Sequence, residues 1–333
     1  MNKISKLQFG SLMLINDVFV LFCLTGGVSV MTAAGFGIGS LLQLVIVMPL
    51  VSIYRQGKTL KDCGKLAELI ALLGTSVWGG LLFSMLWNAG ELVFVPFEGM
   101  GKTGRLLITG IIAVVCVYLS SSGIKALARS AVIAAALGLV CLAIVVVCAV
   151  INSDISNLEA AEDISGLYRE AVKGFALSGG LFGLAVMLGF VKDNIRTAAV
   201  DYFVCKAVIS SIVITTGVLV CGGIMEITDF PIVSAAQLSQ PFPVQRIDSL
   251  FLIIFTVFAV YSIAVQASAA EYLIGEIIPP LKRYRCSIML AVMAGLGAVF
   301  GGRFHYGLPF AIIFAVSVLV IPILYFIKRK VKA

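Results

Sequence analysis

Charged residues are scarce in this sequence. Only 12% of its 333 residues are Asp, Glu, Lys or Arg, and 60% are apolar, whereas a soluble domain carries roughly 25% charged residues. A water-soluble chain of this composition would leave long apolar runs exposed. The scarcity of charge therefore excludes a soluble fold and predicts a membrane protein.

The motifs of enzyme active sites are missing as well. The sequence has no Walker-type phosphate loop, no HExxH and no GxSxG, and its sole histidine is His305. No cysteine spacing suggests a disulfide framework or a metal site. Most cysteines lie in apolar runs, where a thiol behaves as a small hydrophobic group: Cys23, Cys116, Cys141, Cys148, Cys205 and Cys221. We expect no enzyme activity, no cofactor and no metal.

Long apolar runs dominate what is present. They are continuous rather than alternating, which excludes a β-barrel, and several reach the roughly 20 residues that cross a bilayer as a helix. The N-terminal run continues from Phe9 past Met31, too long for a signal peptide. We predict an all-α polytopic protein with ten transmembrane helices at about 10–31, 36–54, 70–95, 105–122, 130–151, 172–191, 198–224, 249–275, 287–301 and 307–327.

The basic residues indicate orientation. If the N-terminus is cytoplasmic, 17 of the 24 Lys and Arg residues face inward, six face outward, and Lys206 lies inside a span. This is the bias expected of cytoplasmic loops, so we predict a multi-pass protein of the cytoplasmic (inner) membrane with both termini inside. The same residues are spread over short loops, with no soluble domain to form a groove, so we expect no binding of nucleic acid.

The outer segment at about 152–171 divides the chain into two sets of five spans. An odd number of helices in each half forces opposite orientations, which predicts an inverted repeat. The single transmembrane domain, 1–333, then consists of repeat one at about 9–151, repeat two at about 172–327 and a cytoplasmic basic tail at 328–333.

Glycine-rich breaks occur in the first helix of each half. Thr25-Gly26-Gly27-Val28-Ser29 interrupts span one, and Ser178-Gly179-Gly180 interrupts span six. In inverted-repeat transporters, unwound backbone at such breaks binds the ligand, although glycine also simply permits close helix packing. We predict a ligand site formed by Thr25, Gly26, Gly27, Ser29, Ser178, Gly179 and Gly180, with Trp87 or Tyr261 as walls.

Two charged residues lie deep within predicted spans. Asp17 and Lys206 each lie about eight residues, or about 12 Å, from the cytoplasmic boundary at 1.5 Å per residue. Such residues usually face a cavity or a partner, so we predict that they pair across spans one and seven. The alternative is two separate residues that are hydrated or that extend toward the interface. Glu91 is a weaker functional candidate, and Glu271 is expected to be interfacial.

Two segments resemble a known family. Gly123-Ile124-Lys125-Ala126-Leu127-Ala128-Arg129, between spans four and five, resembles the Gly-x-x-x-x-x-Arg connection of the spore germination receptor B-subunit (GerAB-like) family. The segment 242–251, which contains Arg246 and Asp248, is similar to that family's aromatic-x-x-x-Arg-[Ile/Leu]-Asp-x-Leu-Phe signature. With the ten-span layout, the resemblance covers nearly the whole chain, although the outer loop at 97–104 lacks the family's Thr-Pro-containing turn.

The resemblance implies both a fold and a function. The family belongs to the amino acid/polyamine/organocation (APC) transporter superfamily, which implies a LeuT-type five-plus-five inverted repeat with broken helices 1 and 6. It further implies a nutrient (germinant) sensing subunit of the spore inner membrane that binds an amino acid or similar molecule and works with A and C type receptor subunits. Two alternatives remain open: an amino acid permease of the same superfamily, and a structural membrane subunit without a ligand.

Overall fold

A computed structural model describes residues 3–94, 101–151, 153–158, 164–177, 180–238, 248–277, 285–300 and 308–332. The regular structure of these residues is helical. Its elements, in chain order, are α1 (Lys6–Phe22), α2 (Val30–Arg55), α3 (Leu60–Cys63), α4 (Lys65–Val93), α5 (Gly101–Ser121), α6 (Ile124–Ile151), the 3-10 helix η2 (Ile155–Leu158), α7 (Ile164–Leu177), α8 (Leu181–Leu188), α9 (Ile195–Cys221), α10 (Ile224–Ile227), α11 (Pro231–Leu238), α12 (Asp248–Ile277), α13 (Arg285–Phe300) and α14 (Leu308–Lys332).

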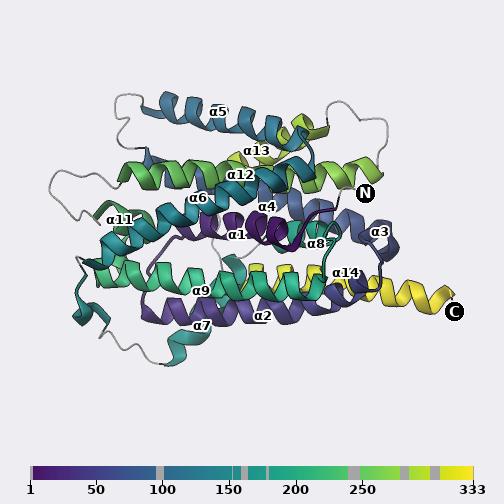
Figure 1. Cartoon of the computed structure of the whole chain (residues 1–333), viewed down its shortest axis with the longest axis horizontal. Helices are drawn as coiled ribbons and strands as arrows, with labels where there is room; N and C mark the ends of the chain where they lie inside the picture. The colour runs from purple at the N-terminus through teal and green to yellow at the C-terminus, as the bar shows by residue number, and fades with distance from the viewer. Residues whose placement is uncertain are drawn as a thin grey trace.

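The long helices run along one axis of the molecule, and both chain ends lie at the same end of the bundle (Figure 1). Bonds between distant segments hold that end together. The Ile4 N–H donates to the Phe190 carbonyl and the Lys192 N–H to the Ile4 carbonyl, each at 2.9 Å. The Lys328 ammonium donates to the Asp62 carbonyl at 3.2 Å. This end of the bundle therefore holds the start of α1, the link after α8 and the end of α14.

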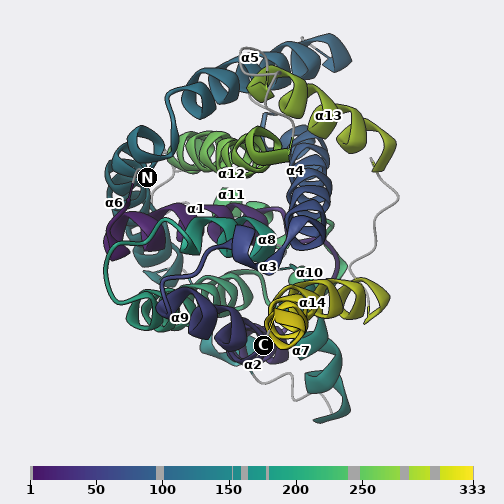
Figure 2. The same cartoon turned by 90° about the vertical axis from the view of Figure 1, so that its right-hand side faces the viewer.

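Helices α1 and α8 lie in the middle of the bundle, and the longer helices surround them (Figure 2). All eight residues of α8 are buried, as are most of those of α1. The outer helices instead expose large apolar side chains, among them Val114 and Tyr118 on α5 and Ile133 on α6. An apolar exterior around an apolar core is what a lipid environment favours, because the bilayer replaces water as the solvent.

Six helices are long and apolar enough to cross a membrane: Val30–Arg55, Lys65–Val93, Thr103–Ser121, Ile124–Ile151, Ile195–Cys221 and Ser249–Ile277. A seventh candidate is the bent pair Gly166–Ala176 and Leu181–Leu188. The chain is therefore an all-helical polytopic membrane protein. The ten-span count and the LeuT-type repeat stay predictions, since α1 and α13 have only 17 and 16 residues.

The boundary of the first predicted span, 10–31, is wrong. Helix α1 ends at Phe22, and α2 begins at Val30 rather than near residue 36. Between them Gly26 adopts φ +81°, which favours glycine, and Ser29 is extended, with its N–H bonded to the Thr32 hydroxyl at 3.0 Å. The glycine-rich segment thus separates α1 from α2 and does not lie near the middle of a continuous span.

The chain also bends where span six was predicted to break. Helix α7 ends at Leu177, α8 begins at Leu181, and their axes differ by 50°. Ser178 and Gly179 lie outside the described residues, so the described part of this break consists of the two helix ends and Gly180.

Candidate functional site

Two adjacent polar residues lie in the apolar α1. Asn16 is fully buried, and the Asp17 side chain is only 8% exposed. Because successive residues on an α-helix are about 100° apart, the two side chains face different neighbours. Asn16 meets α8 and α12, whereas Asp17 meets α9. Helix α1 therefore presents a neutral polar group on one side and a charge on the other.

Asn16 belongs to a cluster of amides beside the break between α7 and α8. Gln266 on α12, also fully buried, donates from Nε2 to Asn16 Oδ1 at 3.4 Å. The glycines of α8 make room for both amides: a Cβ on Gly180 would lie 2.6 Å from Asn16 Nδ2, and one on Gly183 would lie 2.6 Å from Gln266 Oε1. Asn16 Nδ2 and Gln266 Oε1 are buried with no hydrogen-bond partner among the described residues.

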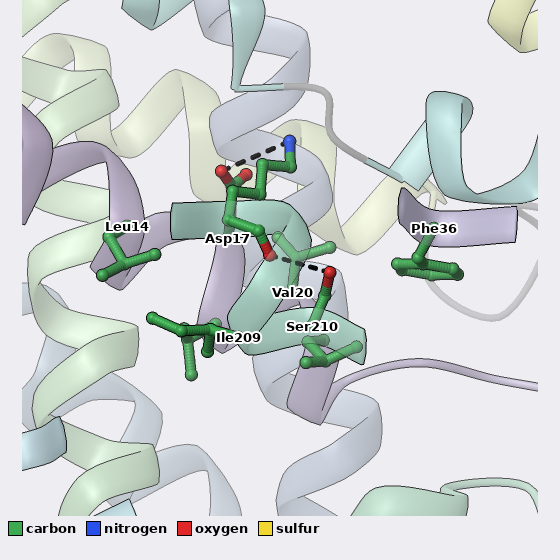
Figure 3. Close-up of a pocket in the computed structure, with 9 residues that line it drawn as sticks. Leu14, Asp17, Val20, Phe36, Ile209 and Ser210 are labelled. Atoms are coloured by element: carbon green, nitrogen blue, oxygen red, sulfur yellow. Dashed lines mark hydrogen bonds and ion pairs between the residues drawn. The ribbon is translucent and has the colours of Figure 1, made fainter. Parts of the chain in front are cut away.

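On the other side of α1, Asp17 and Lys206 form an ion pair. Lys206 Nζ lies 3.3 Å from Asp17 Oδ2, and only 4% and 8% of the two side chains are exposed (Figure 3). The Tyr202 hydroxyl donates to the same Asp17 oxygen. Lys206 also lies 5.8 Å from the ring centre of Tyr202 and 5.7 Å from that of Phe203. The pair predicted from matched depths is thus brought together between α1 and α9.

A neutral amide extends this pair toward α7. Lys206 Nζ donates to Gln43 Oε1 of α2 at 2.8 Å, and Gln43 Nε2 donates to the Phe175 carbonyl at 2.6 Å. Phe175 belongs to the last turn of α7, where backbone carbonyls have no partner within the helix. Gln43 therefore satisfies a helix-end carbonyl and orients its oxygen toward the ammonium group.

The energetics explain why these groups occur together. A buried charge that loses its partner costs roughly 3–5 kcal/mol, whereas an intact buried pair contributes little net stability. Lys206 has a carboxylate, an amide oxygen and two aromatic rings around it. The arrangement keeps both charges inside the bundle, but an apolar pair would stabilise the fold at least as well. Stability alone therefore does not account for the two charges.

The residues of the predicted ligand site are distributed over two places. Thr25, Gly26 and Gly27 are exposed, whereas Ser29 is buried. The Lys173 ammonium of α7 donates to the Gly27 carbonyl at 2.9 Å. Gly180 lies against Asn16 and Met13, in the middle of α1 rather than after its end. Ser178 and Gly179 fall outside the described residues, so a pocket formed by both breaks stays a prediction.

Trp87 and Tyr261, the predicted walls, lie on different helices. Arg105 stacks over the Trp87 ring at 5.1 Å and pairs with Glu91 at 2.9 Å. Trp87 and Glu91 thus belong to a cluster at the end of α4 in which Glu91 is exposed and Trp87 is half-buried. Tyr261 on α12 is half-buried and packs against the hydrophobic core. Neither residue lines the cavity beside Asp17.

The residues of the family resemblance lie at helix starts. Gly123 connects α5 to α6 with φ +85°, a conformation that favours glycine. Arg129 is exposed in the second turn of α6, and Asp248 begins α12. Arg246 lies outside the described residues.

The sequence reading missed the uncharged members of these clusters, Asn16, Gln43, Tyr202 and Gln266. Amides inside apolar runs were the available signal, because a polar side chain within a span is costly unless it has a partner. Among the described residues no group of three or more His, Cys, Asp and Glu side chains is placed to hold a metal ion. No model of a known protein family matches the chain, and no curated protein matches it in sequence.

Proposed function

We propose that the chain is a nutrient-sensing membrane subunit that binds a small polar molecule, such as an amino acid, beside the break between α7 and α8. The observation that carries the proposal is the pair of incompletely bonded amides, Asn16 and Gln266, against Gly180 and Gly183. A buried polar atom without a partner costs roughly 1–3 kcal/mol. A ligand-free structural subunit gains nothing from this cost, whereas a ligand that bonds to these atoms removes it.

The chemistry of the amides favours a ligand with a carboxylate. Asn16 Nδ2 is a hydrogen-bond donor beside Gly180, the residue at the N-terminus of α8. The first N–H groups of a helix have no partner within it and attract anions. A carboxylate placed there meets donors from two elements, while Gln266 Oε1 offers an acceptor to an ammonium or hydroxyl group. An amino acid carries both kinds of group.

The resemblance to spore germination receptor B-subunits supports sensing rather than transport. It adds A and C type subunits as proposed partners and the spore inner membrane as the proposed location. Neighbouring genes for such subunits, or their co-purification with this chain, would support the receptor function. Saturable uptake of an amino acid by reconstituted vesicles would instead support a permease.

The test is a ligand screen on the full chain in lipid nanodiscs. Each of the common amino acids is added, and thermal unfolding is measured, because a ligand that binds the folded state raises its stability. We expect at least one to stabilise the parent, and Asn16→Leu to weaken its binding about tenfold or more, since a hydrogen bond to a charged group is worth roughly 1.5–3 kcal/mol. Gln237→Leu is the matched control, because this amide bonds to the Leu92 carbonyl far from the cluster.

Two results would contradict the proposal. One is that no amino acid changes the unfolding temperature of the parent. The other is that Asn16→Leu and Gln237→Leu bind the stabilising ligand with the same affinity as the parent.

A further inference from the structure

Helices α2 and α7 pack backbone against backbone. A Cβ on Gly39 would lie 2.6 Å from the Phe175 nitrogen, one on Gly35 would lie 2.6 Å from the Glu170 carbonyl carbon, and one on Gly174 would lie 2.7 Å from Phe36 Cα. Glycines four residues apart allow this close approach in membranes. This close contact places the last turn of α7 directly against α2.

Helix α2 also packs along α9, and a hydrogen bond at 3.1 Å from the Ser211 hydroxyl to the Ala33 carbonyl joins them. Polar groups on α7, α2, α9 and α1 form a continuous chain of contacts. The Phe175 carbonyl accepts from Gln43, Gln43 accepts from Lys206, and Lys206 pairs with Asp17 on α1. One line of four groups thus connects the end of α7 to α1.

The contact of α1 with α2 and α9 leaves a small cavity. This cavity of about 20 Å³ lies beside Asp17. Among the residues that line it are Leu14, Val20, Phe36 and Ile209 (Figure 3). This volume admits one water molecule. Asp17 Oδ1 is buried with no partner among the described residues. Beyond Phe22 the chain is non-helical up to Ser29, so α1 is not continuous with α2.

We propose that Asp17, Lys206 and Gln43 form a latch that holds α1 against α9, and that the position of the Phe175 carbonyl at the end of α7 controls it. When the carbonyl is in place, Gln43 presents its oxygen to Lys206, and Lys206 is fixed beside Asp17. When the end of α7 moves, Gln43 loses this orientation, Lys206 loses one acceptor, and α1 separates from α9. The latch does not depend on the ligand proposed above, and its test uses none.

The experiment measures the distance between α1 and α9 in the full chain in lipid nanodiscs. Spin labels are placed on the native Cys205, which is exposed on α9, and on Thr25→Cys just after α1, with the other native cysteines replaced by alanine. We expect one dominant distance in the parent. Three single variants should each increase the population of a second, longer distance on the order of tenfold or more: Lys206→Met, Asp17→Asn and Gln43→Leu. The first two leave a buried charge without its partner, and the third removes the amide oxygen that orients Lys206.

Two variants keep the test decisive. Asp17→Leu with Lys206→Leu removes both charges and leaves an apolar contact, so this double variant should keep the distance of the parent and no longer respond to Gln43→Leu. Gln43→Glu keeps an acceptor for Lys206 but cannot donate to the Phe175 carbonyl. It should therefore hold Lys206 beside Asp17 without control from α7 and retain the distance of the parent. A shift caused by Gln43→Leu that is as large in the double variant as in the parent would overturn the latch, as would a shift in Gln43→Glu as large as in Gln43→Leu.

Discussion

At the scale of single residues, backbone conformation makes a glycine essential at one position and optional at another. Gly123 joins α5 to α6 with φ +85°, whereas Gly110, within α5, has open space where a Cβ would be. A residue with a Cβ is strained at positive φ, and a helical glycine costs about 0.5–1 kcal/mol relative to alanine. The same substitution should therefore have opposite effects at the two sites.

We expect Gly123→Ala to lower the free energy of unfolding by about 1 kcal/mol or more, and Gly110→Ala to leave it unchanged or raise it. Thermal unfolding of the purified chain in detergent measures both. Equal destabilisation by the two substitutions would contradict the assigned conformation of Gly123.

Asp62 lies outside the membrane-spanning helices and should make the stability of the fold depend on pH. Its carboxylate accepts hydrogen bonds from the Thr59 N–H at 2.7 Å and from the Thr59 hydroxyl at 3.1 Å. The backbone N–H bond is the main reason that the pKa of Asp62 is lowered in the folded state. The pKa of Asp62 is thus lower in the folded state than in the unfolded state, where it is about 3.9. The carboxylate therefore stabilises the fold fully at pH above the unfolded pKa and loses this effect as pH falls through the folded pKa.

Asp62→Asn should accordingly unfold more readily than the parent near neutral pH, by about 0.3–1 kcal/mol. The difference should shrink to nothing below the folded pKa. Unfolding temperatures of the two proteins between pH 7 and 3 provide the measurement, and a difference independent of pH would show that the carboxylate is not responsible.

At the scale of helices, the contact between α2 and α7 depends on the absence of side chains. A Cβ on Gly39 would lie 2.6 Å from the backbone nitrogen of Phe175, whereas one on Gly37 would lie 3.7 Å from the Ser211 hydroxyl, an ordinary contact. Gly39→Ala should destabilise the protein by about 1–3 kcal/mol, as overpacking does. Gly37→Ala, two residues away on the same helix, should be close to neutral. Thermal unfolding would disprove the close packing if the two variants behaved alike.

The presence of the long helices could be predicted from the sequence, because the apolar runs in this chain are long and are separated by charged turns. The ends of α1 and α2 could not. Glycine-rich sequence is compatible with a break inside a span, with the end of a helix and with close packing, and only the conformations of Gly26 and Ser29 decide among these. The charged residues Asp17 and Lys206 stand out in apolar sequence, so their pairing could be anticipated. Gln43 and Asn16 do not stand out, and their partners are 132 and 250 residues away.

At the scale of the whole molecule, the two ends of the bundle differ in charge. The end that holds both termini also holds α3 and the start of α9, with Lys6 paired to Asp201 at 3.5 Å and Lys61 paired to Glu276 (Figure 1). The opposite end holds η2, where Asn157 bonds to the Leu219 carbonyl at 2.9 Å. Among the described residues, Lys6, Lys61 and Lys328 lie at the first end, so the positive-inside rule predicts that this end faces the cytoplasm.

Cysteine labelling tests this orientation. Ser156 in η2 and Lys58 between α2 and α3 are both exposed, and they lie at opposite ends of the bundle. In intact cells a membrane-impermeant maleimide should label Ser156→Cys at once and Lys58→Cys only after permeabilisation, because lipid separates the two ends. A reversed pattern would place the termini outside. Labelling of both positions in intact cells would show that these ends are not on opposite sides of a membrane, which contradicts a spanning bundle.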